Sequence, residues 1–180
     1  MGVPTVLNHA HRFGPAGPWE SHVYGACSPG WHTDATRSAA IRDWIAVVRE
    51  HDVTRVCSLL PARDDSGASY MARFRDAFGA ERVLHAPIPD GRLPAVGALT
   101  DTVLPFLAAS RDADERVVVT GLAGLGRTGV VLAAWLVAKR DFRPGEAIST
   151  VLGAGRDPRA VVERGDVTLA DLHALLTAVA

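Results

Sequence analysis

The sequence predicts an α/β fold in which helices flank a central, largely parallel sheet. Two apolar, β-branched runs, at residues 53–60 and 116–120, have the character of strands buried inside a sheet. Helical segments separate such runs, as parallel connections require. Several further helices are expected after the last strand, where they would cover one face of the sheet. Sheets of this kind bind ligands at the carboxyl ends of their strands.

The N-terminal third begins irregularly and then becomes helical. Residues 1–33 are rich in glycine, proline and aromatic residues, which predicts an arm with a short strand near Val23–Gly25. A helix with its N-cap at Thr33 or Asp34 should run to about Glu50, because its apolar residues recur at intervals of three and four.

Glycine and proline mark the limits of the later elements. Gly79 should end a helix, Pro144 should begin one, and Pro105 should kink or break another. A strand is expected at residues 82–88, and helices at residues 68–78, 96–111, 144–155 and 167–179, with one more running from the glycine-rich turn to about Arg140.

Size and charge limit the classes of function. The chain has 180 residues and a net charge of −1. This length suits one domain, which we expect at residues 22–180 after an N-terminal arm at residues 1–21. The balanced charge argues against a nucleic-acid partner. The longest apolar run, residues 130–138, is too short to cross a bilayer, so no membrane partner is expected.

The cysteines and histidines indicate no cofactor. Cys27 and Cys57 form neither a disulfide framework nor a C-x-x-C motif, so the expected location is the reducing cytoplasm. Cys57 lies inside an apolar run and is expected in the core. Four histidines have a spacing that fits no standard metal site, and we expect neither a metal nor another cofactor: His9, His11, His22 and His32.

The most informative segment is the glycine-rich turn that follows the strand at residues 116–120. A strand, a glycine-rich turn and an apolar helix together direct free backbone N–H groups and a helix N-terminus at one point, which favours phosphate. Arg127 adds a planar guanidinium that can hold two phosphate oxygens. The expected phosphate-binding residues are Gly121, Leu122, Ala123, Gly124, Leu125, Gly126 and Arg127.

Three motifs match this turn. Residues 121–128 form a Walker A pattern with arginine in place of lysine, and residues 124–129 form a G-x-G-x-x-G dinucleotide pattern. Both would need a further strand after the turn, whereas only helices are expected beyond residue 130. The third match is Gly124-x-x-Arg127-Thr128, the second half of the signature H-C-x-x-G-x-x-R-[S/T] of protein tyrosine phosphatases.

Several other segments support the third match, in the order expected of one family. The chain resembles the small dual-specificity phosphatases of the cysteine-based superfamily over roughly residues 22–175, which implies their α/β fold. The segments that carry the resemblance are residues 53–60, 85–94, 127–136, 145–148 and 156–161. The resemblance places Asp90 at the general-acid position of residues 85–94. It assigns phosphate binding to Arg127 and a supporting role to Thr128. From the residues alone, Asp90 also suits a turn before Gly91, and Thr128 suits a helix cap.

The chain departs from this family at the catalytic centre. Gly121 occupies the position of the nucleophilic cysteine, and Thr120 that of the histidine before it. Losing a covalent nucleophile can cost on the order of 10⁶ in rate. The backbone N–H groups do not depend on the missing side chain, and losing a thiolate removes a negative charge from an anion site. The resemblance thus implies an inactive member of the family, a pseudophosphatase.

The leading hypothesis is therefore a phosphatase-like domain, inactive as an enzyme, that binds a phosphorylated protein or a small phosphate ester. One alternative is an active phosphoester hydrolase that uses water or a non-cysteine nucleophile, with Asp90 as acid or base. Another is a non-catalytic scaffold whose phosphate loop is a relic. The sequence does not decide between phosphotyrosine, phosphoserine or phosphothreonine, and an inositol phosphate.

Overall fold

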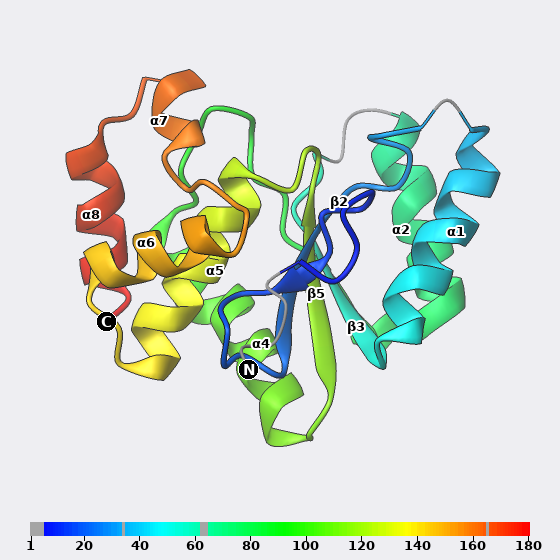
Figure 1. Cartoon of the computed structure of the whole chain (residues 1–180), viewed down its shortest axis with the longest axis horizontal. Helices are drawn as coiled ribbons and strands as arrows, with labels where there is room; N and C mark the ends of the chain where they lie inside the picture. The colour runs from blue at the N-terminus through cyan, green and yellow to red at the C-terminus, as the bar shows by residue number, and fades with distance from the viewer. Residues whose placement is uncertain (1–5, 34, 62–64, 165) are drawn as a thin grey trace.

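A central sheet with helices on both faces forms the body of the protein (Figure 1). The structure is a computed structural model that describes residues 6–33, 35–61, 65–164 and 166–180, and the backbone alone for residues 65–69. Within these residues the sheet has five strands in the order β1-β2-β5-β3-β4. The strands are β1 (Gly14–Pro15), β2 (Val23–Cys27), β3 (Val53–Ser58), β4 (Val83–His85) and β5 (Arg116–Gly121). The helical elements are α1 (Arg37–Glu50), α2 (Asp65–Phe78), η1 (Ala80–Arg82), α3 (Val96–Ala98), η2 (Leu99–Val103), α4 (Leu104–Asp112), α5 (Gly126–Arg140), α6 (Pro144–Gly153), α7 (Ala160–Arg164) and α8 (Leu169–Ala178).

The strand directions confirm the predicted α/β class. Strands β2, β5, β3 and β4 are parallel neighbours, and only β1 at the edge runs antiparallel, against β2. Gly121 at the end of β5 lies in register with Cys27 of β2, and Thr120 with Ser58 of β3. The carboxyl ends of three strands therefore meet at one edge of the sheet.

The helices divide into two layers that bury separate cores. Helices α1 and α2 cover one face, on the right of Figure 1, where Trp44 and Phe74 pack with residues of β3 and β5. Helices α4, α5, α6 and α8 cover the other face. Every residue of α5 from Arg127 to Val137 is buried, which explains the apolar run in the sequence. No helix of the described residues is long and apolar enough to span a membrane.

The N-cap expected at Thr33 is wrong, and the alternative, Asp34, lies outside the described residues. Helix α1 begins at Arg37, and its N-cap is Thr36, whose hydroxyl accepts a hydrogen bond from the Ala39 N–H at 3.4 Å. Thr33 instead accepts from the N–H of Ala35 in a local turn. Threonine offers the same hydroxyl in a turn and at a cap, so composition alone did not separate the two sites.

The kink expected at Pro105 takes the form of a π-helical segment. Helix α3 passes into η2, where the N–H of Leu104 donates to the carbonyl of Leu99 five residues earlier. Helix α4 then begins with Pro105 in its first turn, where proline costs no internal helix hydrogen bond. The wider π-helical turn therefore lets α4 begin at Leu104, so that Pro105 falls in the first turn of a new helix, where proline is tolerated.

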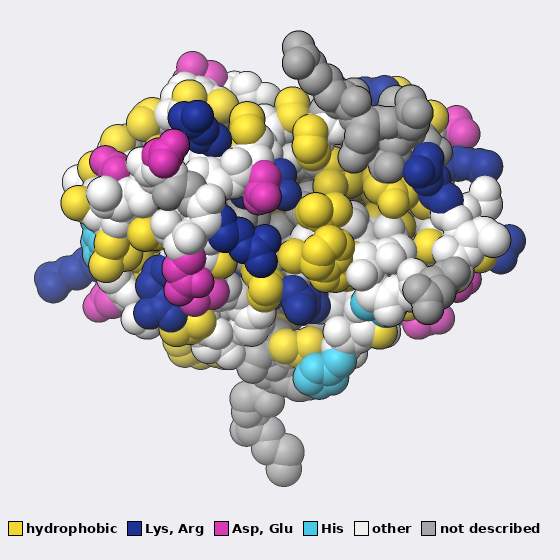
Figure 2. All heavy atoms as spheres, turned by 90° about the horizontal axis from the view of Figure 1, so that it is seen from above, with side chains coloured by type: hydrophobic (Ala, Val, Ile, Leu, Met, Phe, Trp, Pro, Cys, Tyr) yellow, Lys and Arg dark blue, Asp and Glu magenta, His cyan; other side chains and the backbone are white. Residues whose placement is uncertain are grey.

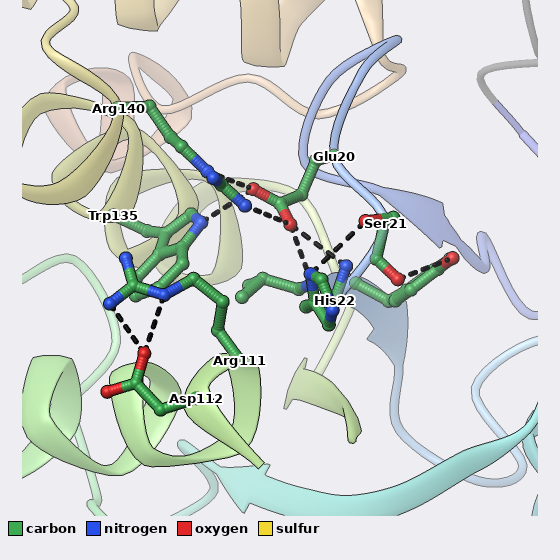
Figure 3. Close-up of polar contacts among 9 residues, drawn as sticks. Glu20, Ser21, His22, Arg111, Asp112, Trp135 and Arg140 are labelled. Carbon is green, nitrogen blue, oxygen red and sulfur yellow. Dashed lines mark hydrogen bonds and ion pairs between the residues drawn. The ribbon is translucent and has the colours of Figure 1, made fainter. Parts of the chain in front are cut away.

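A buried carboxylate ties the start of the sheet to α5 (Figure 3). Glu20 accepts from the indole N–H of Trp135 at 2.8 Å, from Arg140 at 3.0 and 3.2 Å, and from the backbone N–H of His22 at 2.9 Å. Burial by itself would raise the pKa of Glu20, but the hydrogen bonds from Arg140, Trp135 and His22 outweigh it. The pKa therefore lies below the ordinary value of 4.5.

We expect Glu20→Gln to lower the free energy of unfolding by about 1–3 kcal/mol at pH 7, measured in urea. A carboxyl whose pKa is depressed on folding stabilises the fold above its ordinary pKa and loses that contribution as the pH falls through its folded pKa. The difference between the variant and the native chain should therefore narrow below about pH 4.5. Asp112→Asn is the matched control, because that exposed carboxylate bonds to its neighbour Arg111 at the surface and should change stability by less than about 0.5 kcal/mol. A difference that stays constant down to pH 2–3 would contradict the assignment.

Candidate functional site

The turn between β5 and α5, together with the first residues of α5, forms a loop that we call the cradle. It carries the backbone N–H groups of residues 122–127. Gly124 has a positive φ of 71°, and a Cβ there would lie 2.6 Å from the backbone nitrogen of Cys27. Only glycine satisfies both constraints. The turn is thereby pressed against the end of β2, and α5 starts at Gly126 with its N-terminus facing the cradle.

The carbonyl groups of the turn are bonded on its outer side. The carbonyl oxygen of Leu122 accepts from the N–H and the hydroxyl of Ser28, both at 3.0 Å, and that of Ala123 accepts from Arg12 at 2.9 Å. Among the described residues, none accepts a hydrogen bond from the backbone N–H groups of residues 122–127. Six donors at a helix N-terminus are thus left for an anion.

Arg127 is buried at the base of this cradle. Its guanidinium donates to the carbonyl of Ile88 at 2.8 Å and lies 3.7 Å from the carboxylate of Asp90. Burial lowers the pKa of Arg127, Arg164 lowers it further, and Asp90 opposes both. Arginine nevertheless stays charged in proteins. The one carboxylate beside it is largely exposed, so the buried charge is poorly compensated and suits an incoming anion.

Asp90 is part of a turn, and its carboxylate also lies beside Arg127 of the cradle. Gly91 has a φ of 66°, and the N–H of Arg92 donates to the carbonyl of Pro89 at 3.2 Å, which closes the turn. The carboxylate is 68% exposed at the rim, with Arg127 beneath it. This geometry is compatible with both interpretations of Asp90 from the sequence.

The hydroxyl of Thr128 marks the position where a side chain is lacking. It is buried and has no hydrogen-bond partner. A Cβ built on Gly121 would lie 2.9 Å from this oxygen. An unpaired buried hydroxyl costs about 1–3 kcal/mol, and here it points at the residue that the family resemblance places at the nucleophile position.

Three neighbouring side chains, of Thr120, Cys27 and Cys57, are poorly suited to replace the missing nucleophile. Thr120 is fully buried and donates its hydroxyl proton to the carbonyl of Cys27 at 3.0 Å. Burial raises the pKa of Cys57 to about 12, and that of Cys27 to about 11. Both cysteines are therefore neutral thiols at pH 7, and a thiol is a poor nucleophile.

The cradle lies in a pocket on the face that Figure 2 views, where Arg or Lys side chains lie beside hydrophobic ones. The pocket is lined by Trp31, Asp90, the loop from Gly121 to Thr128, Ala160, Val161 and Arg164. All the residues expected from the sequence to bind phosphate are among them. Trp31 and Arg164 were not predicted, because no motif includes either residue and both reach the pocket through tertiary packing.

The two nucleotide-binding alternatives lack their second strand. In the described residues after Gly121, all the regular structure is helical, from α5 to α8. A Walker NTPase needs another strand that ends in a magnesium-binding aspartate, and a dinucleotide-binding fold needs one that ends in an acidic residue. Neither site is built in this part of the chain.

Comparison with known proteins agrees with this architecture. A family model described as "Polymorphic toxin system, DSP-PTPase phosphatase" (Tc-R-P) matches residues 32–141. No curated protein matches. Among solved structures, a mutant form of Tk-PTP is 25% identical with a TM-score of 0.64, covering 89% of this chain and 91% of its own.

Two further structures share the fold at lower identity. Kinase associated phosphatase with its catalytic-site cysteine replaced by serine is 16% identical, with a TM-score of 0.64 and coverage of 86% and 83%. A variant of P. aeruginosa TpbA in complex with pTyr is 19% identical, with a TM-score of 0.59 and coverage of 99% and 93%. With the family model matching more than half of its length, the chain belongs to the DSP-PTPase phosphatase family.

Proposed function

We propose that this domain binds the phosphoryl group of a phosphorylated protein or a small phosphate ester without cysteine-dependent hydrolysis. The observation that carries the proposal is the combination of an intact cradle with a missing nucleophile. The N–H groups of residues 122–127 and the buried Arg127 are available to an anion, while Gly121 leaves the hydroxyl of Thr128 unpaired. The loop thus keeps the groups that bind a phosphoryl group and lacks the side chain that would attack it.

Electrostatics supports binding more strongly here than in a loop with a thiolate. Arg127 and Arg164 both line the pocket, and Asp90 is the acidic residue among its described lining residues. A thiolate would place a second negative charge within a few ångströms of the phosphoryl group, where each such repulsion costs about 1–4 kcal/mol. Glycine at position 121 removes that cost.

The rim of the pocket favours an aryl phosphate as the first ligand to test. Trp31 is 46% exposed and Leu122 is 43% exposed, so the opening presents apolar surface next to the anion cradle. An aromatic ring carried by the phosphate would cover this surface. The related fold of P. aeruginosa TpbA has been solved with pTyr bound. We propose phosphotyrosine in a protein as the ligand class. We also propose the cytoplasm as the location, since both cysteines are free thiols.

Arg127→Ala should weaken the binding of a phosphotyrosine peptide at least tenfold, measured by titration calorimetry. A charge-assisted hydrogen bond contributes about 1.5–3 kcal/mol, and Arg127 can make two. Arg127→Lys should recover part of the affinity, because the charge stays but the planar fork is lost. The matched control is Arg42→Ala, which removes an exposed arginine from α1 and should leave the affinity unchanged.

Two results would replace this proposal. If the peptide binds Arg127→Ala as tightly as the native chain, or binds neither, the loop is a relic and the scaffold alternative holds. If the native chain hydrolyses an aryl phosphate and Asp90→Ala abolishes the turnover, the domain is an active hydrolase that uses another nucleophile. The unphosphorylated peptide serves as the ligand control.

A further inference from the structure

Three metal-ligating side chains from separate segments meet beside the phosphate loop. His11 precedes β1, Cys27 ends β2, and His32 lies before α1. Their ligand atoms all lie within 4.8 Å of one another. The sulfur of Cys27 is 4.0 Å from Nδ1 of His32, and the rings of His11 and His32 are in edge-to-face contact with centroids 4.5 Å apart.

Ordinary packing leaves this cluster poorly explained. His11 is only 7% exposed, and its Nδ1 is buried without a hydrogen-bond partner. A buried unpaired ring nitrogen costs about 1–3 kcal/mol. Cys27 is fully buried with a free thiol, and its sulfur has His32 as its neighbour at 4.0 Å. The interior thus holds a ring nitrogen without a hydrogen-bond partner beside a thiol whose contact with His32 is long.

We propose that His11, Cys27 and His32 bind a divalent metal ion of the zinc class. Imidazole nitrogen and thiolate sulfur are the ligands that Zn²⁺ prefers. With bonds of about 2.0 Å to nitrogen and 2.3 Å to sulfur, two ligands of a tetrahedral zinc ion lie about 3.3–3.7 Å apart. The observed separations, which are at most 4.8 Å, need to close by up to about 1.5 Å. On binding, the Cys27 thiol loses its proton to solvent and the sulfur–metal bond takes its place.

The exposed position of His32 leaves the fourth coordination site facing solvent. His32 lies at the surface, while His11 and Cys27 lie beneath it. Three protein ligands and one open position, filled by water, complete the tetrahedral set. The cluster does not include His9 or His22, and the ring of His22 bonds to Asp114 at 3.0 Å.

The location gives the metal a structural role at the phosphate loop. Cys27 is paired with Gly121 in the sheet, and the next residue, Ser28, bonds the carbonyl of Leu122. Arg12, which follows His11, bonds the carbonyl of Ala123. The same short segments thus hold the metal ligands and the outer side of the cradle. A bound ion would cross-link these segments and fix the direction of the loop N–H groups.

Cobalt titration of the purified, metal-stripped chain tests this site directly. We expect one Co²⁺ per chain, with near-ultraviolet thiolate-to-cobalt charge transfer and the intense visible bands of a tetrahedral ion. Zn²⁺ should displace the cobalt, abolish the bands and raise the melting temperature. His32→Gln should weaken binding at least tenfold, and Cys27→Ala should abolish the charge-transfer band.

Two matched controls separate the cluster from adventitious binding. His9→Gln removes an exposed histidine of the N-terminal segment that also holds His11, and Cys57→Ala removes the other buried thiol. Both variants should bind cobalt like the native chain. His32 is exposed, and its substitution should not prevent folding even if Cys27→Ala does. The proposal is overturned if no cobalt binds, if the bands lack thiolate charge transfer, or if His32→Gln binds as tightly as His9→Gln.

Discussion

Replacing Thr120 with histidine and Gly121 with cysteine is expected to turn the domain into a hydrolase of aryl phosphates. Cysteine at position 121 supplies the missing nucleophile at the end of β5, where six N–H groups and the N-terminus of α5 would stabilise its thiolate. A covalent nucleophile can contribute on the order of 10⁶ in rate in a mature active site. We expect at least about a hundredfold gain over the native chain.

The structure shows how the new side chain would fit. The Cβ of residue 121 would lie 2.9 Å from the hydroxyl of Thr128, so the threonine side chain must shift slightly. Its hydroxyl, now without a partner, would then donate to the thiolate sulfur. Thr128→Val in the double variant should therefore raise the pKa of the cysteine and shift the acidic limb of the pH–rate profile to higher pH.

The matched control keeps the bulk of the new side chain and removes its nucleophilicity. Thr120→His/Gly121→Ser should stay as inactive as the native chain. Asp90→Ala in the double cysteine variant should lower turnover about 10²-fold if the carboxyl at the rim protonates the leaving group. Since Thr120 is completely buried, Gly121→Cys alone is assayed beside the double variant as the less disruptive change.

The activity assay also distinguishes the three hypotheses for the loop. Turnover in the cysteine variants alone identifies an intact scaffold that lacks its nucleophile. Turnover by the native chain and the serine control at the rate of the cysteine variants would show that another nucleophile acts, and the hypothesis of an inactive domain would be wrong. If the cysteine variants fold, by circular dichroism, but neither turns over, the cradle no longer binds phosphate productively.

Local sequence was enough to predict the parallel strands and the loop because their signals are local, whereas the edge strand β1 was not predicted. Strands β3 and β5 are rich in β-branched and apolar residues, and the loop from Gly121 to Arg127 is one contiguous motif. Strand ends were less predictable: the run at residues 53–60 was expected to be strand throughout, yet β3 ends at Ser58. Beyond it, the N–H of Leu59 still donates to the carbonyl of Thr120, but the chain then leaves the sheet.

What could not be predicted depends on distant segments that meet in space. His11, Cys27 and His32 show no metal-site spacing along the chain, because three separate segments bring them together. Arg156 is a second example: no burial was predicted for it from the sequence, yet it is 1% exposed. Its partners are backbone carbonyl groups, which leave no trace in the sequence.

Arg156→Ala is expected to destabilise the protein by at least about 3 kcal/mol, measured by urea unfolding. The guanidinium donates to five backbone carbonyl oxygens from the N-terminal segment, β2 and its own loop: Arg12, Gly14, Pro15, Gly25 and Ala154. Burial lowers the pKa of Arg156 to about 10, so it remains protonated at pH 7. Arg159→Ala is the control, because this exposed arginine forms a surface ion pair with Asp157 and should cost less than about 1 kcal/mol.

Arg156→Met separates the charge from the hydrogen bonds. Buried ion pairs can often be replaced by apolar residues at no cost, because both partners leave together. Here the acceptors are backbone carbonyls that stay behind, so methionine fills the space but leaves up to five oxygens unpaired. We therefore expect Arg156→Met to be nearly as destabilising as Arg156→Ala. A methionine variant as stable as the native chain would show that the free-energy cost of desolvating the guanidinium cancels the stabilisation from its hydrogen bonds. In that case Arg156 would not hold β1 and β2 to the loop that leads to the Ala160–Arg164 wall of the pocket.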